Sequence, residues 1–273
     1  MLYNNVLPMT KIKFSHSKLD VARQCFRKYK YKYVDKVEVD EQNEASQFGG
    51  LIHEIAEFYK GGGKEELLAL YHQFLPKYKV SDVYKPKIAI ALKNIHTFWK
   101  DGVDGKVKES YYEDDIEILY TDEITLVGKI DYRALTNADR NVIIDYKTNK
   151  SNAYANHRNQ LSMYMLLLNL KYGIEYKNMD MMVIYLAMDP IDKKGNAVLN
   201  EGWDNIKKDY KLDESDVEAL KMEIDAIWTK IKKCEIRGDW PTKPSRFNCG
   251  FCKFSHLCEA KYAGEDAYDK PKL

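Results

Sequence analysis

Three polar side chains near the middle of the chain have the types and spacing needed for metal-assisted hydrolysis. Asp131 lies in the alternating stretch 123–135, and Asp145 lies with Lys147 in the next stretch, 141–148. A turn centred on Ala138 joins the two stretches as an antiparallel hairpin and sets Asp131 opposite Asp145. Facing carboxylates repel each other unless a cation lies between them, and Mg²⁺ and Mn²⁺ prefer oxygen ligands. The hairpin therefore predicts a divalent metal site.

Lys147 follows Asp145 by two residues, so both side chains share one face of the predicted strand. A lysine there can orient or deprotonate an attacking water, or steady the charge that develops during hydrolysis. The opposite face, with Val142, Ile144 and Tyr146, is apolar enough to enter the core. An Asp-x-Lys on a strand by itself is more typical of an exposed strand face, so the interpretation needs support from other residues.

Support comes from two predicted helices. Gln160 and Tyr164 are four residues apart in the predicted helix 154–172, so they share a face from which they could hold a phosphate or orient the lysine. His53 follows two glycines in the predicted helix 49–59. It is either a structural histidine or a nitrogen ligand that completes the metal shell.

The elements that position these residues follow from the spacing of apolar side chains. The first part of the chain is predicted to be helical, the middle changes to the alternation of strands, and the last part returns to helix. This order indicates an α/β fold built on one sheet. The predicted helices are 18–35, 49–59, 64–74, 84–99, 154–172 and 213–237, and the predicted strands are 115–120, 123–135, 141–148, 179–188 and 193–201.

Four of the five cysteines have the spacing or position of metal ligands. Three of them form a C-x2-C-x5-C pattern near the end of the chain: Cys249, Cys252 and Cys258. A closed site needs a fourth ligand. His256 would complete a small zinc knuckle, and Cys25, far upstream, is the other candidate. Cys234, in the predicted helix 213–237, is expected to be a buried free thiol.

Net charge and apolar content describe an ordinary globular protein. The 273 residues carry 43 basic and 42 acidic side chains, and 45% are hydrophobic, which excludes a disordered chain. No apolar run approaches the length of a membrane span, and the first 13 residues lack the core of a signal peptide. We therefore expect a cytoplasmic protein without a membrane partner.

Charge is nevertheless uneven along the chain. Residues 1–34 hold eight basic side chains and one acid, with aromatic residues between them. This pattern suits a nucleic-acid backbone and its bases, although a solvated helix whose tyrosines are partly core would have the same composition. Residues 109–123 hold seven acids and no base, which indicates either a solvent face or the edge of a metal site.

Taken together, the motifs resemble the PD-(D/E)XK nuclease superfamily, specifically its RecB-like exonuclease branch. In chain order they are Gly49-x3-His53-Glu54, Gly128-Lys129-Ile130-Asp131, Ile144-Asp145-Tyr146-Lys147-Thr148 and Gln160-x3-Tyr164. Asp145 stands where the superfamily name has Glu more often, as is usual in this branch. The resemblance implies a restriction-endonuclease-like core, in which helices flank a mixed central sheet, with an N-terminal helical region.

The resemblance also implies a role for each motif residue. His53, Asp131, Asp145 and the backbone carbonyl of Tyr146 would bind Mg²⁺ or Mn²⁺. Lys147 would be the catalytic lysine. Gln160 and Tyr164 would support DNA binding and the placement of that lysine.

The cysteines carry a further resemblance. A lone cysteine near the start, paired with a C-x2-C-x5-C pattern near the end, resembles the iron–sulfur staple of AddB-type and CRISPR-adaptation nucleases. It implies a C-terminal iron–sulfur loop and a [4Fe–4S] cluster held by Cys25, Cys249, Cys252 and Cys258. Phe26 stands where a proline is common in that family. Thiolates also suit Zn²⁺, so zinc remains the alternative.

These observations predict a metal-dependent DNA exonuclease that prefers single-stranded DNA, leaves 5′ phosphates and works with recombination, repair or CRISPR adaptation proteins. The alternatives are a non-catalytic DNA-end-binding module with a partner and a zinc-stabilised interaction protein. The expected DNA contacts are Arg23, Arg27, Lys28, Tyr29, Lys30 and Lys32. One nuclease domain is expected over 1–273: a basic helix with the first cluster cysteine (1–45), a helical region with His53 (46–105), a nuclease core (106–202), and a helix with the cysteine cluster (213–262).

Overall fold

The computed structural model describes residues 11–39, 43–148, 154–187 and 203–259. The chain divides into two compact units. The first comprises residues 1–41, 117–127 and 218–273, and the second comprises residues 42–116 and 128–217. Two long strands, β2 (Val107–Leu119) and β3 (Ile124–Thr136), run through both units.

The second unit contains most of a mixed sheet. β4 (Asn141–Lys147) pairs antiparallel with β3 and parallel with β5 (Met179–Tyr185), and β6 (Lys207–Tyr210) pairs antiparallel with β5. β2 pairs with β3. The predicted α/β class with a mixed central sheet flanked by helices is thus confirmed. The strand predicted over 193–201 lies outside the described residues.

The hairpin has the predicted register. Tyr132 pairs with Ile144 and Leu135 with Asn141, so the turn is centred on Ala138. The next residue, Asp139, has a φ of 58°, in the left-handed region that Asp tolerates better than most residues. The turn therefore fixes which side chains of β3 and β4 share a face.

Helices cover the two faces of β4 differently. On one face, Ile144 and Tyr146 join a core with apolar residues of α3 (Glu44–Phe58) and α5 (Lys85–Phe98), as the alternation predicted. The other face holds Asp145 and Lys147, whose side chains contact α6 (Tyr154–Tyr172). α4 (Gly63–Phe74) packs beside α3, and the two views show α3, α4 and α5 together. The short elements of this unit are η2 (Leu75–Lys77), η3 (Asp82–Tyr84), η4 (Trp99–Val103), η5 (Tyr176–Asn178) and α7 (Trp203–Ile206).

In the first unit, β1 (Ile12–Phe14) pairs parallel with residues 124–126 of β3. The helix predicted over 18–35 is wrong in one respect, because Cys25 is extended, with φ −169° and ψ 123°. The segment is therefore three pieces: α1 (His16–Gln24), α2 (Phe26–Tyr29) and the π-helix η1 (Lys30–Val34). α8 (Glu214–Arg237) starts in the second unit and continues into the first, which also holds α9 (Arg246–Gly250) and η6 (Ser255–Leu257). Among the described residues, no helix has the length and apolar content needed to cross a membrane.

Candidate active site

The lysine and the helix motif predicted from the sequence form one hydrogen-bonded network in the second unit. Lys147 Nζ lies 2.6 Å from Asp145 Oδ2 and donates to Gln160 Oε1 at 3.0 Å. Gln160 Nε2 donates to Asp145 Oδ1 at 2.7 Å and to the Tyr164 hydroxyl at 2.8 Å. Tyr164 in turn donates to the backbone carbonyl of Lys129 at 2.9 Å. The network holds the ammonium group of Lys147 in one place and ties α6 to β3 and β4.

Gly128 explains how α6 comes close enough to β3. A Cβ at this position would lie 2.5 Å from Leu167 Cδ1, which is closer than carbon atoms can approach. Any larger residue would force the buried Leu167 side chain to shift, so glycine permits the observed packing, in which Tyr164 reaches the carbonyl of the next residue, Lys129. The glycine of the Gly-Lys-Ile-Asp motif has a packing role.

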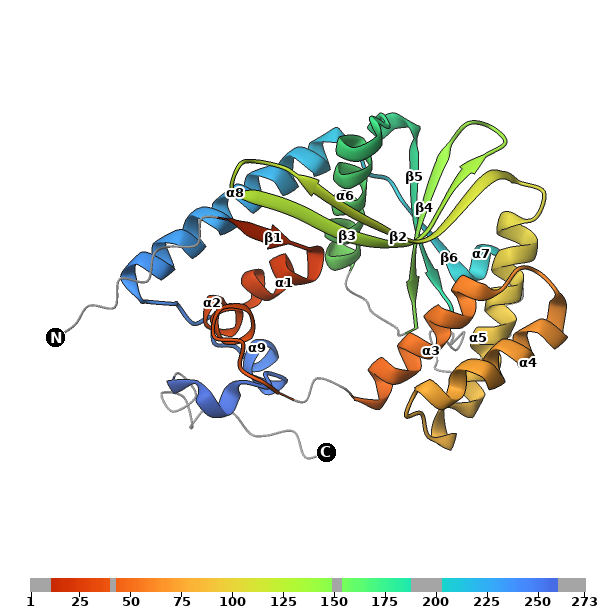
Figure 1. Ribbon diagram of the computed structural model, residues 1–273, viewed down its shortest axis with the longest axis horizontal. Helices are drawn as coiled ribbons and strands as arrows, with labels where there is room; N and C mark the ends of the chain where they lie inside the picture. Colours follow the sequence, from red (N-terminus) through yellow and green to blue (C-terminus); the bar gives the residue numbers. More distant parts are fainter. Residues whose placement is uncertain (1–10, 40–42, 149–153, 188–202, 260–273) are drawn as a thin grey trace. The chain divides into compact units, whose positions relative to one another are not determined.

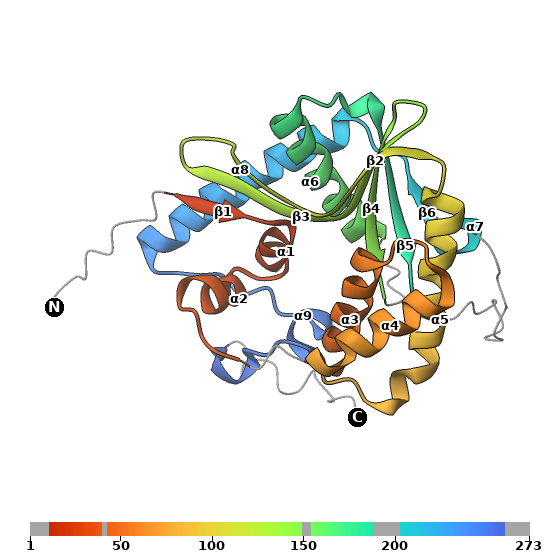
Figure 2. The same cartoon turned by 45° about the vertical axis from the view of Figure 1, so that its right-hand side comes forward.

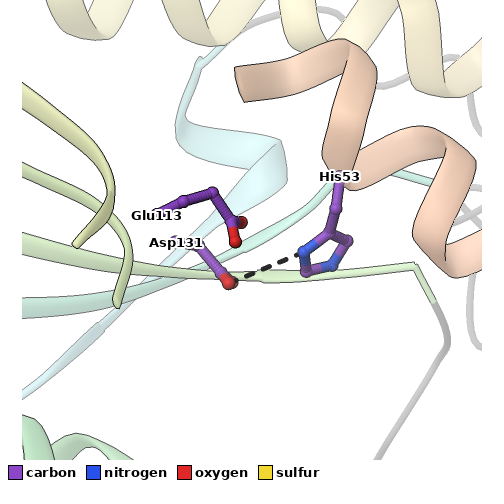
Figure 3. Close-up of side chains that lie close together, drawn as sticks. All are labelled: His53, Glu113 and Asp131. Carbon is purple, nitrogen blue, oxygen red and sulfur yellow. Dashed lines mark ion pairs between the residues drawn. The ribbon is translucent and has the colours of Figure 1, made fainter. Parts of the chain in front are cut away.

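Asp131 lies beside this network and points toward His53. Its Oδ1 is 3.6 Å from His53 Nδ1 (Figure 3). Its Oδ2 accepts a 2.6 Å hydrogen bond from the backbone N–H of Tyr146. Backbone pairing between β3 and β4 extends as far as Tyr132 and Ile144. Beyond that pair, the Asp131 carboxylate accepts the hydrogen bond of the Tyr146 amide of β4, and this bond fixes the orientation of the carboxylate.

The sequence did not identify the third member of this group, Glu113. His53 from α3, Glu113 from β2 and Asp131 from β3 each offer an atom within 4.8 Å of the others (Figure 3). Glu113 also forms an ion pair with Lys129. Its only sequence signal was the acidic stretch 109–123, which left open a solvent face or the edge of a metal site.

Burial and like charge perturb the ionisation of the site. Burial raises the pKa of Asp145 from 3.8 to about 6, Asp131 adds to the rise, and Lys147 opposes it. Burial would lower the pKa of His53, but Asp131, Asp145 and Glu113 together raise it above its ordinary value. Perturbed groups of this kind cluster at functional sites.

The donor set fits a divalent cation, because one imidazole nitrogen and carboxylate oxygens converge on one place. The structure brings His53 and Asp131 of the predicted ligand set together with Glu113. Asp145 lies beside them, but its two oxygens contact Gln160 and Lys147.

A family model described as the PD-(D/E)XK nuclease superfamily matches residues 13–259. The chain belongs to this superfamily. No curated protein matches the chain significantly. A solved structure titled "Crystal structure of SSO0001" is similar to 91% of this chain and is itself covered over 87%, at 14% identity and a TM-score of 0.40.

Beyond the candidate active site of this PD-(D/E)XK chain, the first unit brings residues 24–31 into contact with residues 241–257. Arg27 N–H donates to the carbonyl of Pro241 at 3.2 Å, the Tyr31 hydroxyl donates to the Leu257 carbonyl at 2.8 Å, and Asn248 donates to the Gln24 carbonyl at 3.1 Å. α2 and α9 accordingly lie near each other in both views (Figures 1 and 2). Cys25 and the C-x2-C-x5-C segment thus share one unit.

The cysteine sulfurs are not gathered as tightly as the active-site group. Burial raises the pKa of Cys252, and the neighbouring thiols of Cys25 and Cys249 add to the rise. However, among the described residues no three cysteines have their sulfurs within 4.8 Å of one another. Cys234 is buried, as predicted, with 5% of its surface exposed.

Several side chains of the basic segment are held by partners inside the first unit. Arg23 forms two 2.7 Å hydrogen bonds to Glu223, Arg27 donates to the Trp240 carbonyl, and Lys30 pairs with Asp35 at 2.5 Å. Lys28 donates to neutral Gln24, so its charge is not neutralised by this partner. The ammonium group of Lys32, the remaining basic side chain expected to contact DNA, lies over the Tyr33 ring, 5.6 Å from its centroid.

Tyr29 corrects one expectation from the sequence. Its ring is fully buried and stacks on Trp240, with 6.2 Å between ring centroids and 12° between planes. A base cannot reach this ring, because stacking needs an exposed face. Tyr29 is a core residue of the first unit.

Proposed function

We propose that the chain is a metal-dependent DNA exonuclease that acts preferentially on single-stranded DNA and leaves 5′ phosphates. The observation that carries the proposal is the placement of Lys147 between Asp145 and Gln160, beside the Asp131–His53 pair. A buried carboxylate next to a second carboxylate costs folding free energy, and such costs are typical of functional sites. Membership in a nuclease superfamily supports the same chemistry.

Each residue of the site has a separate role in phosphodiester hydrolysis. Mg²⁺ or Mn²⁺, when bound by His53, Asp131, Asp145 and the Tyr146 carbonyl, supplies positive charge at the scissile phosphate and acidifies water. Lys147 can donate hydrogen bonds to the attacking water and steady the developing negative charge. Gln160 keeps the Lys147 ammonium group in place, and Tyr164 anchors Gln160 to the Lys129 carbonyl.

The proposal includes a [4Fe–4S] cluster on Cys25, Cys249, Cys252 and Cys258, with Zn²⁺ as the alternative. It is supported by the contacts between the segments around Cys25 and Leu257, and by the neighbouring thiols of Cys252. A cluster would cross-link the segment around Cys25 to the segment 249–258 within the first unit. We further propose DNA contacts at Lys28 and Lys32 and a role in recombination, repair or CRISPR adaptation.

Catalysis is tested with end-labelled single-stranded DNA, anaerobically purified protein and Mn²⁺, Mg²⁺ or EDTA. Lys147→Gln should lower the cleavage rate about 100-fold or more, because it removes the ammonium group that would orient the attacking water and steady the developing negative charge. Lys177→Gln is the matched control, since the Lys177 side chain is exposed and its ammonium group pairs with the exposed Glu175. A Lys147→Gln rate equal to the control would refute the role of Lys147. A folded wild-type protein that binds DNA ends without cleaving them would favour the non-catalytic alternative.

The cluster is tested by iron, zinc and sulfide analysis and by the visible absorption of anaerobically purified protein. Cys252→Ser should remove the bound metal, because a thiolate ligand is lost. Cys234→Ala should keep it, since Cys234 is a buried thiol outside the proposed set. Equal metal content in the two variants would exclude Cys252 as a ligand.

A further inference from the structure

Glu113 is fixed in the active site by a local departure from strand geometry. Its φ of 51° breaks the extended conformation inside β2. Its two neighbours are held by β3, since Asp114 pairs with Arg133 at 3.0 Å and Tyr112 packs on Tyr132 with ring centroids 5.1 Å apart. Glu113 is therefore held between two anchored residues, and its carboxylate faces His53 and Asp131 (Figure 3).

The carboxylates of the site differ in the partners that they already have. The two oxygens of Asp145 contact Gln160 and Lys147, and one oxygen of Asp131 accepts from the Tyr146 amide. The group with atoms within 4.8 Å of one another is His53, Glu113 and Asp131. Atoms bound to one Mg²⁺ lie at most about 4.2 Å apart, twice a bond length of about 2.1 Å. Small side-chain shifts would bring this group onto one ion.

We propose that Glu113 is a direct ligand of the divalent ion and that Lys129 competes with the ion for the Glu113 carboxylate. The proposal rests on the metal-dependent function proposed above and adds a ligand from β2 to it. Lys129 can leave without disturbing the fold, because its side chain is 53% exposed and its backbone carbonyl is held by Tyr164. Metal binding would then replace a lysine ammonium by a divalent cation on the same carboxylate.

The competing explanation is that Glu113 and Lys129 form an ordinary structural ion pair between strands. Partly exposed pairs of this kind contribute about 1 kcal/mol or less. The two explanations differ in their consequences for metal affinity. In a structural pair, Glu113 and Lys129 affect the affinity for the ion only as nearby charges, whereas a ligand and its competitor change it more strongly and make the effect of Lys129 depend on Glu113.

The test is Mn²⁺ binding to the full chain without DNA, measured by isothermal titration calorimetry and by the electron paramagnetic resonance of free Mn²⁺. Glu113→Gln keeps the size of the side chain and should raise the Kd about 10-fold or more. Asp115→Asn is the matched control, because Asp115 is an exposed acid on the same strand. It should change the Kd less than about 3-fold, the effect of one screened charge.

Lys129→Met tests the competition. It should lower the Kd for Mn²⁺ several-fold in the wild-type chain. It should have little effect in the Glu113→Gln chain, because the carboxylate for which Lys129 and the ion compete is absent there. An equal effect in both chains would show that Lys129 acts only through its long-range charge, and this would overturn the competition. Thermal melting without metal identifies any variant whose folding has changed.

Failure of this inference differs from failure of the proposed function. If wild-type protein binds Mn²⁺ and Glu113→Gln binds it as tightly as Asp115→Asn, the Glu113 inference is overturned and the nuclease proposal stands. If wild-type protein binds no Mn²⁺ and cleaves no DNA, both are overturned.

Discussion

The charged Asp145 should destabilise the metal-free protein at neutral pH, and Asp145→Asn should therefore raise the free energy of unfolding. The pKa of Asp145 in the folded chain is about 6, against 3.8 as the ordinary value, which corresponds to about 3 kcal/mol. Because the folded pKa is raised, the folded state binds more protons than the unfolded state between these values. The stability that the protonated Asp145 contributes is therefore fully present below pH 3.8 and is lost as the pH rises through about 6.

Asparagine resembles the protonated carboxylic acid and cannot ionise. The amide oxygen of Asp145→Asn can still accept from Gln160, and Lys147, at the edge of the network, can turn toward solvent. The variant should equal the wild type near pH 4 and exceed it by up to about 3 kcal/mol above pH 7. The comparison reports Asp145 together with its effect on His53, because the Asp145 charge helps to raise the pKa of that histidine.

The assay is urea unfolding in EDTA from pH 4 to pH 8, with Asp115→Asn, a variant of an exposed acid, as the control. Added Mn²⁺ should reverse the order at pH 8, because a bound cation stabilises the charged form of Asp145 in the wild type. A variant less stable than the wild type at every pH would refute the reasoning. It would mean that the pairing with Lys147 outweighs the burial of Asp145 and the repulsion from Asp131.

Two more predictions address packing and DNA binding. Gly128→Ala should lower the free energy of unfolding by about 1–3 kcal/mol, because the new methyl group overlaps Leu167. Gly250→Ala is the control, because a methyl group there would meet none of the described atoms within 4 Å. Equal urea midpoints for the two variants would contradict the close approach of α6. Lys28→Gln should weaken DNA binding and reduce the salt slope by about one ion, whereas Arg23→Gln, whose charge Glu223 already neutralises, should change DNA affinity less. A larger effect of Arg23→Gln in fluorescence anisotropy would contradict this assignment.

The hairpin and its polar face were predictable because local sequence determines them. A short turn between two alternating stretches allows few registers, and the one centred on Ala138 is observed. Once that register is set, the two-residue period places Asp145 and Lys147 on one face. The helix motif was predictable for the same reason, since Gln160 and Tyr164 are one turn apart and contact each other.

The basic segment shows where local periodicity fails. Apolar and aromatic spacing over 18–35 predicted one helix, but the backbone at Cys25 is extended. The residues that hold the segment are distant in sequence, because Arg23 binds Glu223 and Arg27 binds the Trp240 carbonyl. Such tertiary contacts override helix propensity, which is worth only tenths of a kcal/mol per residue. They also explain why Tyr29 is a core residue.

Glu113 could not be predicted, because its placement depends on one backbone angle. In a regular strand, side chains alternate between the two faces, and the seven acids of the stretch 109–123 give no reason to single out one of them. The positive φ at Glu113 changes that alternation locally, while the contacts of Tyr112 and Asp114 with β3 keep the strand in place. Backbone strain at a non-glycine residue persists only where surrounding contacts over-determine it. The residue that no sequence motif marks is therefore placed beside His53 and Asp131 by a single backbone angle.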